Sequence, residues 1–325
     1  MTRTGASVPR GTRVPAAMRV TREWTVTGAL LLLLGVMAVA APGFFEPQPL
    51  LSRLTSSAPR LLVTCGIVLV MVCREVDISM GSLFAVSSVA AGMLLASGVS
   101  LPMAALGAVA VGIAGGALNG ALISGLRLPS IVVTLATMVT WREALRLARQ
   151  GVFVNLPDGV QWFGLPMVAG QFVVCAVALF LWVGLALGLR HLAAGRYLYA
   201  AGSDSEAARL AGLRPRLTTF SAFVALGGLT GAAAVLNLVQ SPQVDPATGR
   251  LLELEAIAAA VVGGVAVSGG RGSLWGVFAG FLLLTCLGPA LTYLGVKPYW
   301  DKAIQGAVIL TAVVADGCRR RRGSQ

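Results

Sequence analysis

Charged and metal-binding side chains are scarce in this chain. Only 12% of its 325 residues are Asp, Glu, Lys or Arg, whereas a soluble domain carries about 25%. There is one histidine, His191, and the five cysteines form neither a CxxC pair nor any spacing typical of metal ligands. We therefore expect no metal site and no structural disulfide.

Catalytic motifs are also lacking. The sequence contains no P-loop, no HExxH, no GxSxG and no Ser/His/Asp set with a usable histidine. We expect a chain that is not an enzyme and holds no cofactor, so that any ATP and Mg²⁺ needed for its work bind to another subunit. The net charge of +12 does not indicate nucleic-acid binding, because the positive residues flank apolar segments.

Apolar residues are abundant instead. They make up 56% of the chain, and the mean hydropathy is +0.82, which predicts an all-α, polytopic helix bundle in a lipid bilayer. Forty glycines fit close packing between such helices. About ten spanning segments are predicted: Trp24–Phe45, Arg60–Cys73, Ile78–Ser97, Leu101–Gly125, Ser130–Ala148, Met167–Leu189, Leu217–Val239, Leu254–Val267, Ser273–Leu294 and Asp301–Ala315.

The positive residues predict the orientation. Of the 25 lysines and arginines, 17 lie in segments that are inside if the N-terminus is inside, and 8 lie outside. This bias predicts that both termini are cytoplasmic. We expect a disordered basic tail over 1–23, a membrane domain over 24–316 and a second basic tail over 317–325.

Two of the predicted segments are short. Arg60–Cys73 and Leu254–Val267 have 14 residues each, which as helix span about 21 Å, less than a hydrocarbon core. Acidic runs at 75–77 and 253–255 open neighbouring segments from opposite faces of the membrane. These features predict broken helices and an inverted repeat, in which segments two to five correspond to segments seven to ten.

Polar residues within the apolar segments are candidates for a substrate pathway, because they are costly in a membrane. Hydroxyls and an aromatic ring share one face of the fifth segment, an arrangement suited to a sugar or small polyol. The alternative is that the hydroxyls bond only to carbonyls of their own helix. The predicted pathway residues are Asp77, Ser79, Asn119, Ser130, Thr134, Thr137 and Trp141.

The basic loop over 190–216 has the pattern of a short helix on the cytoplasmic face. Ser203 or Asp204 can cap its first turn, Glu206 lies near its positive end, and Gly212 is a natural stop. Such an element suits docking of a second protein, although an ordinary connecting loop remains the alternative.

Several motifs in order resemble one known family. They are Glu75–Ser82, Asn119–Gly120, Leu128–Leu135, Gly195–Ala200, Glu206–Gly212, Glu253–Gly264 and Gly269–Gly272. From about Trp24 to Asp316 the chain resembles permease subunits of bacterial ATP-binding cassette importers for ribose, xylose or galactose. The details fit the rhamnose or autoinducer-2 branch at least as well.

The resemblance implies a multi-pass subunit of the bacterial inner membrane. Its partners would be a second permease, identical or related, a cytoplasmic ATPase of the tandem-domain type, and an extracytoplasmic sugar-binding protein. ATPase coupling would fall to Ser203, Asp204, Glu206, Ala207, Ala208, Arg209 and Gly212, and gating to Glu253, Glu255, Gly263 and Gly264. The outer arginines Arg142, Arg146 and Arg149 would dock the binding protein.

Two other functions fit part of the pattern. An ion-gradient-driven transporter of a small polar solute would use buried carboxylates, for which Asp77, Glu253 and Glu255 are candidates. A structural or signalling membrane protein without cargo is a third possibility, against which the costly Asp77 and Asn119 argue.

Overall fold

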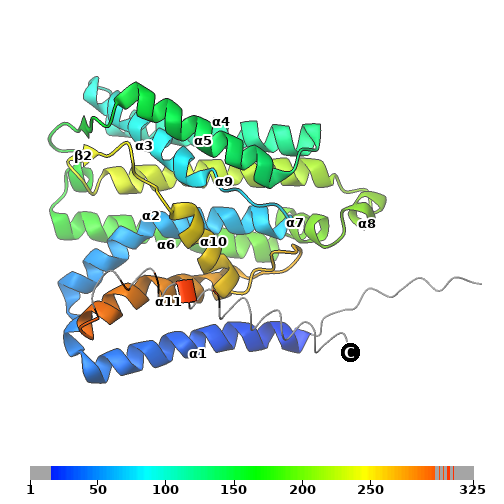
Figure 1. The fold of residues 1–325 in the computed structure, drawn as a ribbon, viewed down its shortest axis with the longest axis horizontal. Coiled ribbons are helices and arrows are strands. Elements are labelled where there is room, and N and C mark those ends of the chain that lie inside the picture. The colour runs from blue at the N-terminus through cyan, green and yellow to red at the C-terminus, as the bar shows by residue number, and fades with distance from the viewer. Residues whose placement is uncertain (1–15, 297–299, 301–302, 304–305, 308–309, 311–325) are drawn as a thin grey trace, which may run out of the picture.

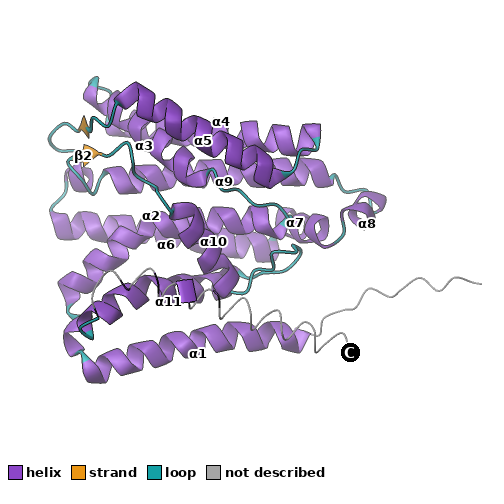
Figure 2. Ribbon diagram, in the orientation of Figure 1, coloured by secondary structure: helices purple, strands orange, loops and turns teal. Residues whose placement is uncertain are grey.

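The computed structural model describes residues 16–296 and residues 300, 303, 306, 307 and 310. Its α-helices are α1 (Ala16–Ala40), α2 (Pro47–Val72), α3 (Met80–Ala96), α4 (Leu101–Gly120), α5 (Ser130–Arg149), α6 (Met167–His191), α7 (Ala193–Ser203), α8 (Ser205–Leu210), α9 (Pro215–Leu238), α10 (Leu252–Val262) and α11 (Leu274–Tyr293). Helices dominate the described chain (Figures 1 and 2), which confirms the all-α bundle.

Short elements complete the fold. Two 3-10 turns, η1 (Pro42–Phe45) and η3 (Gln161–Gly164), lie in loops, and a π-helical turn, η2 (Ala121–Gly125), continues α4. The strands β1 (Val154–Asn155) and β2 (Gln243–Val244) pair antiparallel, with Val154 opposite Val244. Figure 1 places β2 at the end of the bundle opposite α8, so these two elements mark its outer and inner ends on the predicted orientation.

Six described helices are long and apolar enough to cross a membrane. They are found in Glu23–Ala40, Pro47–Val72, Leu101–Gly125, Met167–His191, Pro215–Leu238 and Leu274–Tyr293. The other predicted segments correspond to α3, α5 and α10, while Asp301–Ala315 lies largely outside the described residues. The count of ten spans therefore stays a prediction.

Two boundaries differ from the sequence-based ones. Helix α1 begins at Ala16, so the tail assigned to 1–23 overlaps helical residues. The second segment is not short, because α2 has 26 residues and starts at Pro47. Its first turns contain polar residues, so a search for apolar runs does not include them. They are nevertheless helical, because proline suits the first position of a helix. A further proline, Pro59, lies inside the helix.

Two short helices, the 17-residue α3 and the 11-residue α10, meet in the middle of the bundle, and we call them the half-length helices. A non-helical stretch over 73–79 precedes α3, and a second one over 245–251 precedes α10, which has only 11 residues. Their N-terminal ends touch, since a Cβ added at Gly81 would overlap the carboxylate of Glu253 and the carbonyl of Gly249. From this point α3 runs toward the β2 end and α10 toward the α7 end (Figure 1).

This arrangement matches the predicted inverted repeat. Each half consists of a long helix, a non-helical stretch, a half-length helix and a further long helix. In the first half these are α2, 73–79, α3 and α4, and in the second they are α9, 245–251, α10 and α11. The two half-length helices point in opposite directions, as an inverted repeat requires. The same order of elements thus builds both halves from opposite sides.

Glycines allow α4 and α9 to pack without intervening side chains. A Cβ added at Gly112 or Gly116 would overlap backbone atoms of Gly227 or Phe223, and one at Gly231 would overlap the backbone of Ala108 and Val109. The four-residue glycine spacing is therefore a packing seam inside one chain. It joins the two halves around α2, whose second half is almost entirely buried.

Candidate transport pathway and coupling segment

A buried polar node lies where α3 begins. Asp77 is 1% exposed, and its Oδ1 accepts hydrogen bonds from the backbone N–H (2.7 Å) and hydroxyl (2.6 Å) of Ser79. The Asn119 amide of α4 donates to Asp77 Oδ2 at 3.4 Å and to Ser79 Oγ at 2.8 Å. The carboxylate thus lies at the positive end of α3 and joins it to α4.

Two of the fifth-helix hydroxyls lie against the stretch before α3. Ser130 Oγ accepts a hydrogen bond from the backbone N–H of Val76 at 3.3 Å. Thr134 Oγ1 donates to the carbonyl of Ser130 in its own helix at 2.8 Å and lies 3.5 Å from the carbonyl of Val76. Thr137 also donates to carbonyls of its own helix, and Trp141 is only partly buried. The structure therefore brings together the predicted residues around 76–79 as a scaffold, and Trp141 lies apart from them.

The glutamates of α10 find arginine partners on two neighbouring helices. Glu255 Oε2 lies 3.3 Å from Arg60 Nη1 of α2, and Glu253 Oε1 lies 3.9 Å from Arg142 Nη2 of α5. These pairs explain why Arg60 and Arg142 are found on the outer side of the predicted topology, where positive residues are in the minority. Sequence reasoning named both glutamates but not their partners, because residues so far apart in sequence give no local signal.

The three outer arginines are engaged within the chain. Besides the contact of Arg142 with Glu253, Arg146 pairs with Glu143 at 2.6 Å, and Arg149 donates to the carbonyls of Val152 and Phe153. Arg146 remains largely exposed. Docking of a binding protein by these arginines stays a prediction.

The predicted docking helix is present as α8. Asp204 caps it, since its Oδ1 accepts hydrogen bonds from the N–H groups of Glu206 and Ala207, both at 3.0 Å. Gly212 ends it with a φ of +83°, a conformation suited to glycine. Hydrogen bonds from Arg209 lower the pKa of Glu206, so this exposed carboxylate is ionised at neutral pH.

Helix α7 connects α8 to the ends of other helices. A Cβ added at Gly202 would overlap the carbonyl of Val72, and the N–H of Gly270 donates to that same carbonyl at 2.8 Å. The Tyr199 hydroxyl donates to the carbonyl of Gly272 at 2.8 Å. Helix α7, which leads into the predicted coupling segment, thus contacts both the end of α2 and the loop that follows α10.

The predicted gating glycines lie where α10 meets α11. A Cβ at Gly263 would overlap the backbone of Val277, and Gly264 has a φ of +98° as the helix ends. Glycine permits this close crossing and the turn after it. The loop that α7 contacts therefore begins at this crossing of α10 and α11.

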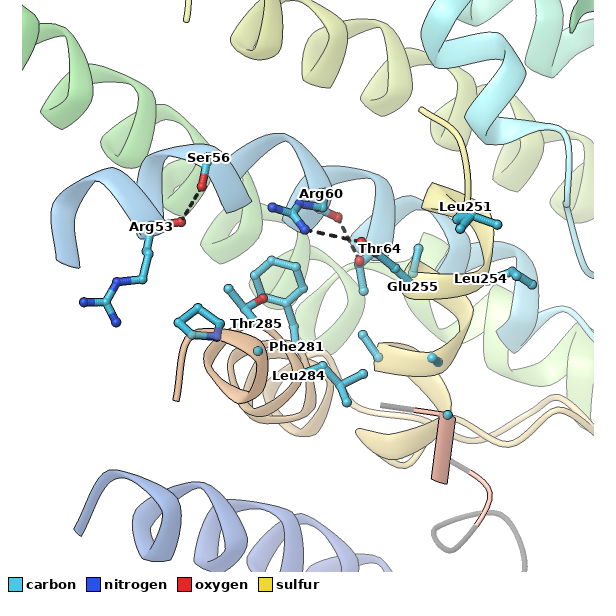
Figure 3. Close-up of a pocket in the computed structure, with 16 residues that line it drawn as sticks. Arg53, Ser56, Arg60, Thr64, Leu251, Leu254, Glu255, Phe281, Leu284 and Thr285 are labelled. Atoms are coloured by element: carbon cyan, nitrogen blue, oxygen red, sulfur yellow. Dashed lines mark hydrogen bonds and ion pairs between the residues drawn. The ribbon is translucent and has the colours of Figure 1, made fainter. Parts of the chain in front are cut away.

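A cavity of about 400 Å³ opens between α2, α10 and α11 (Figure 3). Arg60 and Glu255 meet in its wall, and Phe281 and Thr285 of α11 face it. A second space of about 130 Å³ lies near Arg142 and Arg250. None of the pathway residues named from the sequence lines either space, whereas Arg142 and Arg146, named for docking, both line the second.

The comparisons with known proteins agree with this architecture. Residues 50–313 match the family described as the branched-chain amino acid transport system permease component. The chain belongs to this permease family. The chain is therefore a multi-pass transport subunit of the inner membrane and part of an ATP-driven importer. In such an importer the ATPase is a separate subunit, and a binding protein delivers the substrate to the permease.

The most similar proteins reported below are permeases for autoinducer 2. The permease is 36% identical over 301 residues to the autoinducer 2 import system permease protein LsrC of Enterobacter sp. (strain 638), covering 92% of this chain and 88% of the relative. It is 34% identical to the protein of that name from Escherichia coli O157:H7, covering 91% of this chain and 87% of the relative. No solved structure matches the permease. The family assignment favours the ATP-driven importer over the ion-gradient-driven transporter.

Proposed function

We propose that this permease forms the membrane pathway for a monosaccharide or a sugar-like signal of the autoinducer-2 type. The similarity to autoinducer-2 permeases over 92% of the chain carries this proposal. The fold supports it, because two half-length helices that meet at Gly81 and Glu253 are the arrangement from which alternating-access pathways are built. The family takes its name from branched-chain amino acid transport, so an amino acid is the alternative cargo that a test must include.

The assembly follows from the same relationship. Two permeases, identical or related, would enclose the pathway, and a tandem-domain ATPase would grip the inner surface at Ser203–Gly212. ATP and Mg²⁺ would bind to that ATPase, with no cofactor on the permease itself. The contacts of Gly202 and Tyr199 with α2 and the 269–272 loop support this role, because they link an exposed segment to the half-length helix α10.

The arginines of α5 suggest how the outer partner would be sensed. Arg146 is exposed and could meet an acidic lobe of the binding protein, while Arg142 of the same helix contacts Glu253 at the start of α10. Docking would then act on the same half-length helix as the ATPase does. Charge reversal at Arg146 should weaken uptake most at low salt, since exposed charges are screened as salt rises.

The test is uptake in the bacterium that encodes the permease. Its gene is deleted and restored, and entry of autoinducer-2, D-ribose, L-rhamnose and L-leucine is followed. We expect deletion to abolish uptake of one of the sugar-like compounds, and arsenate, which depletes ATP, to stop it while a protonophore at intact ATP levels does not. Loss of L-leucine uptake alone, or uptake that follows the ion gradient, would contradict the proposal.

A further inference from the structure

The cavity between α2, α10 and α11 has no role among the features described so far. Its volume of about 400 Å³ lies within the range of about 300–1,000 Å³ typical of small-molecule sites. We propose that this cavity binds the transported molecule, a neutral polyhydroxylated compound the size of a monosaccharide, and that Arg60, Glu255 and Thr285 are its polar contacts. This rests on the proposed function.

The polar groups of the cavity suit hydroxyls. Arg60 of α2 and Glu255 of α10 face each other at 3.3 Å, and their side chains remain 43% and 33% exposed. A guanidinium offers several donors and a carboxylate several acceptors, so both keep capacity for a ligand while paired. Thr285 of α11 adds a hydroxyl from the third wall (Figure 3).

A proline adds a backbone acceptor at the same place. Pro289 lies inside α11 and lacks an N–H, so the carbonyl of Thr285 cannot receive the helical hydrogen bond from position 289. Helix α2 contains the equivalent case at Pro59, where the freed carbonyl of Thr55 accepts from Gln240 Nε2 at 3.2 Å. Thr285 and Pro289 both line the cavity, so a ligand hydroxyl can satisfy this acceptor.

Most of the remaining wall is apolar, with Arg53, Ser56 and Thr64 as its other polar residues, and it favours a ring-shaped ligand. The buried ring of Phe281 and the side chains of Leu251 and Leu254 line the space. A few polar groups set among apolar ones fix the orientation of a ligand and provide specificity. The C–H face of a sugar ring can pack on the aromatic side chain while its hydroxyls reach the polar groups.

The Arg60–Glu255 pair selects against charged cargo. Arg53 also lines the cavity, but its guanidinium donates to the backbone carbonyls of Pro49 and Phe44 and lies over the ring of Phe44, so it is engaged outside the pair. A single anion or cation would compete with one member of the Arg60–Glu255 pair and leave the other uncompensated, which is costly away from water. A zwitterionic amino acid could satisfy both charges only by separating the pair. A neutral polyol needs no such separation, and the pair also keeps α2 and α10 together around it.

Protection from thiol modification tests the site directly. The five native cysteines are replaced by serine, and Thr285→Cys is introduced into the importer in membranes of its own bacterium. A matched control, Ser221→Cys, lies exposed on α9 away from the cavity. Modification by a maleimide is then measured with autoinducer-2, D-ribose, L-rhamnose or L-leucine present during ATP-driven uptake.

We expect the transported polyol to slow modification of Thr285→Cys several-fold and to leave Ser221→Cys unchanged. Equal modification with and without the compound that the same membranes transport would overturn the cavity assignment and leave the proposed function intact. Protection by L-leucine alone would overturn the ligand class. If Thr285→Cys does not assemble, Phe281→Leu should raise the concentration for half-maximal uptake, and an unchanged value would also count against the site.

Discussion

At the scale of single residues, the polar groups where α3 begins are explained by their partners. Asp77, Ser79 and Asn119 hydrogen-bond to one another across the start of α3 and the body of α4. A buried polar group costs little when it is hydrogen-bonded and much when it is not. The node therefore fixes where the half-length helix α3 begins, and none of its residues lines the cavity between α2, α10 and α11.

Removing the carboxylate should unbalance this node. In Asp77→Ala, the hydroxyl and the backbone N–H of Ser79 lose their acceptor, at a cost of about 1–3 kcal/mol for each unsatisfied group, while the Asn119 amide keeps its bond to Ser79 Oγ. We expect a lower thermal unfolding midpoint in detergent. Ser97→Ala, which removes a hydroxyl bonded only to Leu94 of its own helix, is the control. Equal midpoints for the two variants would show that the node contributes nothing to stability.

The contact between α5 and α10 gives a second test. Arg142 lies 3.9 Å from Glu253, a glutamate that is only 8% exposed in its side chain. Arg142→Ala leaves this carboxylate without its cation, so we expect a lower unfolding midpoint than for Arg146→Ala, whose arginine is 72% exposed. Differential scanning fluorimetry of the two purified variants compares them. A larger loss for Arg146→Ala would contradict the pairing.

At the scale of elements, the short helices connect the exposed inner end to the centre of the bundle. Helix α8 is exposed except for Ala208, whereas Gly202 at the end of α7 is buried against Val72 and Gly270. The 269–272 loop continues from α10, whose N-terminal end touches α3. Movement of α8 by a partner can therefore reach both half-length helices through backbone contacts.

Changes in the coupling segment should separate folding from transport. Glu206→Lys reverses the charge near the N-terminal end of α8 and removes its pair with Arg209, so we expect loss of uptake with normal membrane insertion. Deletion of residues 203–213 should do the same. Glu143→Lys is the control, because it breaks a comparable exposed ion pair, with Arg146, away from the inner end of the bundle. In a pull-down, the permease with this change should still bind the ATPase. Normal uptake after the deletion would refute the coupling role.

At the scale of the whole molecule, the two similar halves, which begin with α2 and α9, face each other through α3 and α10. Helices that meet in this way are used in alternating-access transport, which needs a source of energy. The energy must come from a bound partner. The permease is accordingly one component of an importer, as its family is.

The isolated permease should therefore be inactive. In proteoliposomes that contain only this chain, we expect no ATP hydrolysis and no accumulation of autoinducer-2 or D-ribose. Addition of the ATPase and the binding protein of the same importer should bring both activities. Liposomes with the ATPase and binding protein but without the permease are the control. If the permease alone accumulated solute when a proton or sodium gradient is imposed, the ion gradient and not ATP would be the driving force.

Local features of the sequence were sufficient for much of the fold. Apolar runs identified most helices, the short run at 254–267 predicted the half-length helix α10, and the Ser203–Gly212 pattern predicted α8 with its cap. These features depend on neighbouring residues, so composition and spacing reveal them. The start of α2 at Pro47 was missed because its polar first turns are stabilised by packing with α6, as in the hydrogen bond from Gln48 to Gln171.

The partners across the bundle depended on three-dimensional packing. Helical spacing placed Ser130 and Thr134 on one face of α5 but could not show that this face meets Val76. Arg60 lies 195 positions from Glu255, and only the approach of α2, α10 and α11 brings them together at a cavity. Apolar composition is enough to commit a chain to the membrane, whereas the place where polar groups meet is set by which helices pack together.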